Sequence, residues 1–300
     1  MKNCSLEETI QTVFGKTAHI IKRERIHGGD INDAYRVLLS TGDSLFVKTN
    51  SIDNAEFFRT EAAGLAALAS SGNIGVPRVF GIGTDEEGGF SYLALEYLDS
   101  SRRGSSYWED FGHRLAMLHR ADCSAFVPDG ESGMKYGFTE DNYIGASPQK
   151  NIPGRKWADF YRDCRLMPQI KMAERYFDSG LLKKADYLLD HLDSRLREPE
   201  FPSLLHGDLW GGNVMCGPDG RAWLIDPAVY AGDFEADLAM TQLFGGFPAA
   251  FYAAYHEVNP IDRKGYSERR ALYHLYQLLN HLNLFGTAYL GSVEEILRSM

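Results

Sequence analysis

Residues 206–213 read HGDLWGGN, and an acidic residue, Asp226, follows a short distance downstream. The segment between them, VMCGPDGRAWLI, has two apolar runs around a Gly-Pro-Asp-Gly turn and predicts a two-stranded hairpin, which would bring Asn213 beside Asp226. Phosphoryl transfer uses an acid followed five positions later by an amide and then by a second acid. Each residue alone could merely cap a turn. Together they predict Asp208 as the catalytic base and Asn213 and Asp226 as metal ligands.

A lysine ends an apolar strand far upstream of this run. Residues 45–48 read LFVK, and Glu61 follows in a segment with helical composition. In kinases such a lysine binds ATP phosphates and a helix carboxylate holds it, because an unpaired buried ammonium tends to lose its proton. We therefore expect Lys48 and Glu61 to anchor the phosphates. Glu56 is a competing partner, and Lys48 could instead face solvent from an edge strand.

Two weaker patterns complete the expected nucleotide site. The first is Gly28-Gly29-Asp30-Ile31-Asn32, whose backbone amides could approach phosphate oxygens between two strands. A Gly-Gly hairpin is more often only a turn, and Asp30 adds an unfavourable charge. The second is residues 93–98, where Glu96 and Leu98 are the expected contacts to adenine. A plain buried edge strand is the alternative.

The sequence pattern changes from strands to helices near residue 100. Before it, β-branched and aromatic runs predict five strands, at Ala18 to Ile26, Ala34 to Leu39, Leu45 to Thr49, Val79 to Gly83 and Phe90 to Tyr97, with one helix at Asn54 to Ser70. After it, helical patterns dominate, at residues 108–121, 157–177, 181–196, 237–244, 249–257 and 268–290.

These elements predict an α+β, two-lobed, protein-kinase-like fold. A small antiparallel β lobe with one main helix, residues 1–97, would bind the nucleotide. A larger and mostly helical lobe, residues 98–300, would carry catalysis and the acceptor, with the ligand held between the lobes. Two unrelated domains joined near residue 100 are the alternative.

Composition excludes several classes of protein. The 300 residues are 44% hydrophobic and 24% charged, as in a globular protein, and the net charge of -10 argues against a nucleic-acid surface. No stretch is long and apolar enough to cross a bilayer, and the start is not a signal peptide, so we expect no membrane partner and a cytoplasmic location. The four cysteines have no metal-ligand or disulfide pattern, so we expect free thiols.

The chain resembles the fructosamine kinase (ketosamine kinase) family, within the aminoglycoside phosphotransferase and choline kinase group. The likeness covers nearly the whole chain and rests on LLHGDLWGGN at residues 204–213, IDPA at 225–228, FGGFP at 244–248 and YQLLNHLN at 276–283. It implies phosphorylation of a sugar hydroxyl by ATP and Mg²⁺. The acceptor would be a ketosamine, a fructosamine- or ribulosamine-type glycation adduct on a small molecule or a protein lysine. We favour a monomer.

The resemblance also implies a role for Trp210, whose indole face would meet the C–H surface of the sugar, although core packing is an alternative. Asp141 and Asn142 are further candidate substrate contacts and could equally be core residues. Asp30 stands where some relatives have a redox-active cysteine, so we expect no such control here. Asp233 stands where many relatives have a histidine, which puts the role of that histidine in doubt.

Two alternatives remain open at this stage. A kinase of the same group could act on choline, which calls for an aromatic cage, on an aminoglycoside, which calls for carboxylates, or on another metabolite alcohol. A nucleotide-binding pseudokinase scaffold would have lost the lysine, the acid or the amide, and all three are present.

Overall fold

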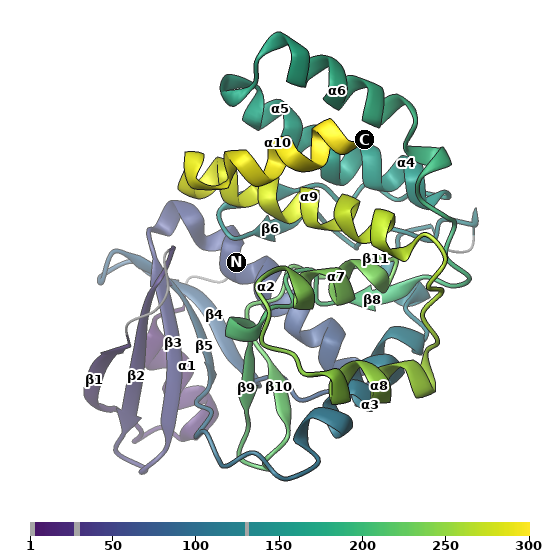
Figure 1. Ribbon diagram of the computed structural model, residues 1–300. Coiled ribbons are helices and arrows are strands. Elements are labelled where there is room, and N and C mark those ends of the chain that lie inside the picture. Colours follow the sequence, from purple (N-terminus) through teal and green to yellow (C-terminus); the bar gives the residue numbers. More distant parts are fainter. Residues whose placement is uncertain (1–3, 27–30, 130–131) are drawn as a thin grey trace. The chain divides into compact units, whose positions relative to one another are not determined.

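The computed structural model describes residues 4–26, 31–129 and 132–300 (Figure 1). Contacts between Cα atoms divide the chain into two compact units. The first contains Met1–Ser105 and Met215–Ile225, and the second contains Ser106–Val214 and Asp226–Met300. The hairpin that follows Asn213 therefore groups with the N-terminal unit.

The first unit is built on a five-stranded antiparallel sheet. All five strands expected from the sequence are present, in the spatial order β1-β2-β3-β5-β4. Their bounds are Ile20–Ile26 for β1, Asp33–Leu39 for β2, Ser44–Asn50 for β3, Val79–Asp85 for β4 and Phe90–Glu96 for β5.

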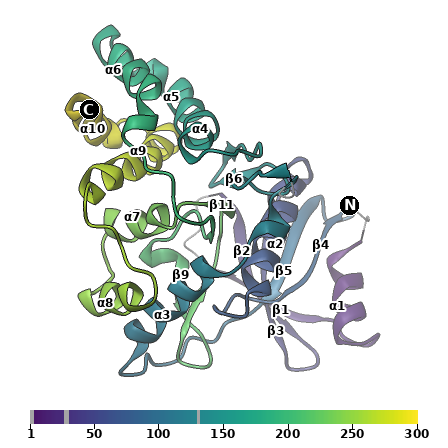
Figure 2. The same cartoon turned by 90° about the vertical axis from the view of Figure 1, so that its right-hand side faces the viewer.

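The two faces of this sheet are covered by different helices (Figure 2). Side chains alternate along a strand, so Tyr92 and Ala94 of β5 pack in the core that includes α1 (Leu6–Phe14), whereas Leu93 and Leu95 pack in the core that includes α2 (Ala55–Ser70). Val47 of β3 belongs to the α1 core. The next residue, Lys48, must therefore point to the α2 face.

Helix α1 was not among the predicted elements. It begins with a capping box, in which the Ser5 hydroxyl accepts from the Glu8 amide at 3.1 Å and the Glu8 carboxylate accepts from the Ser5 amide at 2.8 Å. Leu6 and Ile10, one turn apart, are buried against the sheet. Burial of this apolar face stabilises a helix that is short for an isolated segment.

The second unit is mostly helical. Its helices are α3 (Tyr107–Arg120), α4 (Trp157–Tyr161), α5 (Met167–Ala173), α6 (Ser179–Asp190), α7 (Glu235–Leu243), α8 (Ala249–Val258), α9 (Tyr266–Phe285) and α10 (Leu290–Ser299). Helices α3 and α8 lie side by side in Figure 1, with Gly112 at the contact, where a Cβ would lie 2.3 Å from the Phe251 carbonyl oxygen. The small residue lets the two backbones approach closely.

The helix predicted at residues 157–177 is broken rather than continuous. A π-helical turn, Arg162–Leu166, separates α4 from α5. Within it Arg165 is fully buried, stacks 3.8 Å over the Tyr230 ring and donates to the Lys150 carbonyl oxygen and to Asn151 Oδ1. The turn thus coincides with a set of tertiary contacts, which helical periodicity alone does not reveal.

Short strand pairs complete the fold. Strand β8 (Ser203–Leu205) pairs with β11 (Tyr230–Gly232), and β6 (Asn142–Ile144) pairs with β7 (Ser147–Gln149). The predicted hairpin is present as β9 (Val214–Cys216) and β10 (Ala222–Leu224). Strand β8 leads directly into the HGDLWGGN run.

Candidate active site

The loop that carries Asp208 packs closely against the segment that follows Asp226. Gly207 has a φ of +83°, and a Cβ on it would lie 2.1 Å from the Ala228 carbonyl oxygen. The Ala228 amide donates to the His206 carbonyl oxygen at 2.8 Å. Only glycine suits both the left-handed backbone and the close approach, so this residue is fixed by geometry.

Asp208 and Asn213 are in direct contact. The Asn213 Nδ2 atom donates to the Asp208 carbonyl oxygen at 2.8 Å and to the Asp208 carboxylate at 3.1 Å. The pKa of Asp208 is raised to about 7, chiefly by burial and also by the charges of Asp226 and Asp237, while the hydrogen bond from Asn213 opposes the shift. A carboxyl with this pKa can accept a proton near neutral pH, as a general base must.

Asp226 has an unusual backbone conformation. Its φ is +55°, and among the described residues the only other non-glycine residue with a positive φ is Asp129. A non-glycine residue in the left-handed region costs about 1–3 kcal/mol and is typical of functional sites. The conformation turns the chain sharply after β10 and places the charge of Asp226 near Asp208.

Asp237 of α7 holds the backbone of the loop at residues 206–213, which carries the predicted base Asp208 and is called the catalytic loop below. Its buried carboxylate accepts from the His206 amide at 2.7 Å and from the Gly207 amide at 2.9 Å. The His119 ring lies 3.2 Å from the same carboxylate and 2.8 Å from the Tyr255 hydroxyl. Burial alone would raise the pKa of Asp237, but the hydrogen bond from His119 and the nearby charges hold it below its ordinary value.

Sequence reasoning missed Asp237. Nothing in the pattern of α7 distinguishes it from an acid on a solvated helix face, because its partners lie far away in the chain.

Lys48 and Glu61 meet in the first unit. Their side chains form an ion pair of 2.7 Å and are only 8% and 13% exposed. The competing residue, Glu56, pairs instead with Arg59 at 2.7 Å. The structure therefore selects Glu61 as the partner of Lys48. The pair lies on the α2 face of the sheet, opposite the α1 core.

The predicted phosphate loop is described only in part. Gly28, Gly29 and Asp30 lie outside the described residues. The remaining two, Ile31 and Asn32, are tied to the end of β3, because Asn50 Nδ2 donates to the Ile31 carbonyl oxygen at 3.3 Å and to Asn32 Oδ1 at 2.6 Å. Asn50, which sequence reasoning did not select, thus connects the end of this loop to the strand that carries Lys48.

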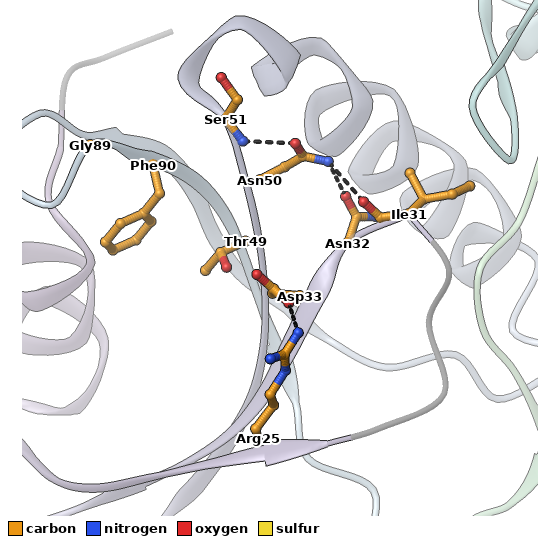
Figure 3. A pocket seen from close by; sticks show the side chains of 9 residues that line it. All are labelled: Arg25, Ile31, Asn32, Asp33, Thr49, Asn50, Ser51, Gly89 and Phe90. Atoms are coloured by element: carbon orange, nitrogen blue, oxygen red, sulfur yellow. Dashed lines mark hydrogen bonds and ion pairs between the residues drawn. The ribbon is translucent and has the colours of Figure 1, made fainter.

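A polar hollow of about 460 Å³ lies beside these contacts (Figure 3). An ion pair between Arg25 and Asp33 crosses it, so both charges are already satisfied. Its lining residues are Arg25, Ile31, Asn32, Asp33, Thr49, Asn50, Ser51, Gly89 and Phe90.

The two expected adenine contacts take part in packing of the first unit. Glu96 already uses its amide, which donates to the Arg78 carbonyl oxygen at 2.8 Å, and its carboxylate, which accepts from the Arg78 amide at 3.2 Å. Leu98 is 7% exposed. The amide of Glu96 is thus already paired, and contacts of Glu96 and Leu98 with adenine stay predictions.

The side chain of Asn142 takes part in buried hydrogen bonds within the second unit. It is buried, and its side chain donates to the Val229 carbonyl oxygen at 2.8 Å and accepts from Gln149 at 2.8 Å. It therefore supports the chain just after the Asp226 turn. Asp141 is exposed and pairs with Lys150 at 2.6 Å. These partners favour structural roles for both residues.

Trp210 lies on the loop that carries Asp208 and faces solvent. The residue is 40% exposed, and a Cβ on Gly212 would lie 2.3 Å from its ring. The glycine thus lets the indole fold back over its own loop. Core packing, the alternative for Trp210, does not agree with this exposure.

Asp233 has a structural role at the position where many relatives were expected to carry histidine. It is fully buried, accepts from the Tyr273 hydroxyl at 2.9 Å and accepts from the Glu235 amide at 3.0 Å. It therefore stabilises the start of α7.

Comparison with known proteins identifies the family. A family model described as fructosamine kinase matches residues 3–300. The chain belongs to the fructosamine kinase family. This family member is 39% identical to the "Probable ketoamine kinase" of Synechocystis, over 98% of this chain and 95% of that protein. It is 37% identical to the chloroplastic protein-ribulosamine 3-kinase of Arabidopsis thaliana, over 94% of this chain and 83% of that protein.

Solved structures agree with the family assignment. A Haemophilus somnus crystal structure that bears the fructosamine-3-kinase name has a TM-score of 0.85 and 31% identity, and covers 98% of this chain and 96% of its own. The predicted α+β, kinase-like fold is therefore confirmed for this family member. It is an ATP-dependent kinase. None of the helices in the described part of the chain has the length and apolar character of a membrane span.

The residues of this fructosamine kinase family member fit a divalent cation bound through oxygen. Asp226 offers a carboxylate and Asn213 an amide oxygen, the donors that Mg²⁺ prefers. The pKa of Asp208 is raised chiefly by burial, and a cation would relieve the smaller contribution from the charge of Asp226. In the described ranges, no group of three or more His, Cys, Asp or Glu side chains could hold a metal. A cation here would therefore need phosphate oxygens and water to complete its coordination.

Activity should depend on pH through Asp208. Its carboxylate must be deprotonated to accept a proton, and its pKa is about 7, so kcat/KM for the acceptor should fall about tenfold per pH unit on the acid side. A bound cation would favour the charged carboxylate, which places the midpoint at or below pH 7. Initial rates between pH 5 and pH 9 at saturating ATP measure this limb. A midpoint well above pH 7 would show that another group controls the rate.

Proposed function

We propose that the protein transfers the γ-phosphoryl group of ATP to a sugar hydroxyl of a ketosamine, of fructosamine or ribulosamine type, on a small molecule or on a protein lysine. The observation that carries this proposal is the pairing of a near-neutral base, Asp208, with an exposed indole two residues later, Trp210. An aromatic face suits the C–H surface of a sugar, and the base suits its hydroxyl.

The proposed reaction is a direct transfer in which Asp208 is the base. The Asp208 carboxylate accepts the hydroxyl proton while the sugar oxygen forms a bond to the γ-phosphorus. The bond from that phosphorus to the β,γ-bridging oxygen breaks, and ADP leaves with its electron pair. Asn213 orients the base through its hydrogen bond to the carboxylate. Mg²⁺, when bound, neutralises charge on the phosphate oxygens.

Lys48, fixed by Glu61, would bind the α- and β-phosphates. Replacing Lys48 with Met removes a charged donor, so kcat/KM for ATP should fall about 10- to 100-fold, as expected for a hydrogen bond between charged groups. Steady-state kinetics with varied ATP measure the loss. Lys22→Met is the matched control, because Lys22 forms an exposed ion pair with Glu24 on the same sheet and should stay within about twofold of the unchanged protein. Equal effects of the two substitutions would contradict the assigned role of Lys48.

An assay of ADP release tests the function directly. The purified protein is incubated with Mg-ATP and, separately, with ribulose-lysine, fructose-lysine, choline and kanamycin. Release of ADP with a ketosamine supports the proposal. Release with choline or kanamycin and with neither ketosamine would replace it by the alternative of a related small-molecule kinase.

A further inference from the structure

Five aromatic side chains form a continuous row in the second unit. Trp210 lies 6.2 Å from Phe244, and Phe244 lies 5.0 Å from His281, between ring centroids. His281 in turn lies 5.6 Å from Phe285 and 5.1 Å from Tyr289. We call these five residues the aromatic row.

Three members of the aromatic row are exposed, whereas aromatic clusters in proteins are usually buried. Trp210, Phe244 and Phe285 are 40%, 43% and 50% exposed. In contrast, Phe111 and Phe251, which pack between α3 and α8, are fully buried. A contiguous exposed apolar surface of this kind is typical of a binding site rather than of core packing.

The backbone just after Phe244 has an unusual conformation. The two residues after it, Gly245 and Gly246, have φ values of +73° and +99°. Residues with side chains rarely adopt two successive left-handed conformations. The loop after α7 therefore turns in a way that depends on glycine at both positions, with Phe244 at its start.

The row begins at the catalytic loop and leads away from it. Gln277 of α9 donates to the Gly207 carbonyl oxygen at 3.0 Å, next to Asp208. His281 and Phe285 follow one and two turns later on the same face of α9, about 12 Å further along the helix at 1.5 Å per residue. A molecule that reacts at Asp208 can therefore extend along these rings.

The chemistry of the row selects the kind of group that it would contact. Apart from His281 its members have no titratable nitrogen or carboxylate, and burial lowers the pKa of His281 below its ordinary value. The surface is thus apolar and uncharged at neutral pH. It suits a flat or aliphatic substituent, and it lacks the carboxylates that a polycation such as an aminoglycoside would need.

We propose that the aromatic row binds the amine-side substituent of the substrate and favours aromatic or apolar amines over small ones. This inference rests on the proposed ketosamine kinase function. In a ketosamine the sugar and the amine substituent lie on opposite sides of one nitrogen. With the sugar at Trp210, the substituent extends toward Phe244 and Phe285.

The test compares ribulose adducts of methylamine and benzylamine as substrates. The unchanged protein should give a kcat/KM about five- to tenfold higher for the benzylamine adduct, mainly through KM, as expected for one or two aromatic contacts. Phe285→Ala and Phe244→Ala should each lower this ratio toward one. Tyr187→Ala is the matched control, because Tyr187 is an exposed aromatic residue of α6 that stacks on His191 outside the row. It should leave the ratio unchanged.

The outcomes separate the inference from the function on which it rests. Turnover of both adducts with a ratio near one in the unchanged protein, or a ratio that survives both substitutions, overturns the role of the row alone. Turnover of neither adduct overturns the proposed function as well. A change of oligomeric state in Phe285→Ala with an unchanged ratio would make the row a contact between copies of the chain, and would also overturn the inference.

Discussion

Replacing Asp208 with Asn should lower kcat about 10²–10⁴-fold while the Kd for ATP changes by less than about threefold. The amide keeps the shape of the side chain but cannot accept the hydroxyl proton, and general base catalysis contributes about this much to rate. ATP binding should persist because the base acts on the acceptor. Steady-state kinetics and calorimetric titration with ATP measure the two quantities.

The thermal stability of Asp208→Asn serves as a control, because the direction of its change can be predicted. The pKa of Asp208 is raised in the folded protein, so the native state retains a proton that the unfolded chain has lost, and this contribution to stability falls as pH rises toward 7. The amide that replaces the carboxylate in the variant has no charge to bury. The Tm of Asp208→Asn should therefore equal or exceed that of the unchanged protein at pH 8. A lower Tm together with lost ATP binding would show that Asp208 holds the fold rather than the acceptor proton.

Replacing Asp237 with Asn should have the largest effect on stability. Its carboxylate accepts from the amides of His206 and Gly207 and pairs with His119, all in the interior. An amide side chain accepts fewer of these bonds, and removing one partner of a buried charged pair costs about 3–5 kcal/mol. The free energy of unfolding, measured by denaturant titration, should fall by about that amount.

The kinase activity of Asp237→Asn should also fall, because the loop that carries Asp208 loses the carboxylate that binds its backbone amides. The matched control is Asp163→Asn, which removes an exposed ion pair with Arg162 and should change the unfolding free energy by less than about 0.5 kcal/mol. If Asp237→Asn kept both full stability and full activity, the anchoring role of Asp237 would be wrong.

The elements that the sequence predicts well are those with local patterns. Five strands follow from β-branched runs between turn residues, and the hairpin between Asn213 and Asp226 follows from its Gly-Pro-Asp-Gly turn. Helix α1 has a local signal too, because Ser5 and Glu8 form a capping box. It was not predicted, because the start of the chain was judged only by its polar and acidic composition. The helix predicted at residues 268–290 instead ends at Phe285, and the amide of the next residue, Gly286, donates to the Leu282 carbonyl oxygen.

The contacts that sequence could not reveal are between distant segments. Asn142 reads as a candidate substrate contact because it lies in an irregular loop, but its partner is the Val229 carbonyl oxygen. Asp237 reads as an ordinary helix acid, but it binds the amides of the catalytic loop. The pKa of Asp208 depends on both burial and neighbouring charge, neither of which a single sequence specifies.

The central claim is that Asp208 directs the γ-phosphoryl group of ATP to a ketosamine hydroxyl. The most direct measurement is a reaction of enzyme, Mg-ATP and ribulose-lysine, with the adduct analysed by mass spectrometry and phosphorus NMR. The account predicts that the unchanged protein converts the adduct to a phosphate monoester and that Asp208→Asn, at saturating ATP, does not. An adduct that remains unphosphorylated with the unchanged protein, or one phosphorylated equally by both, would contradict it.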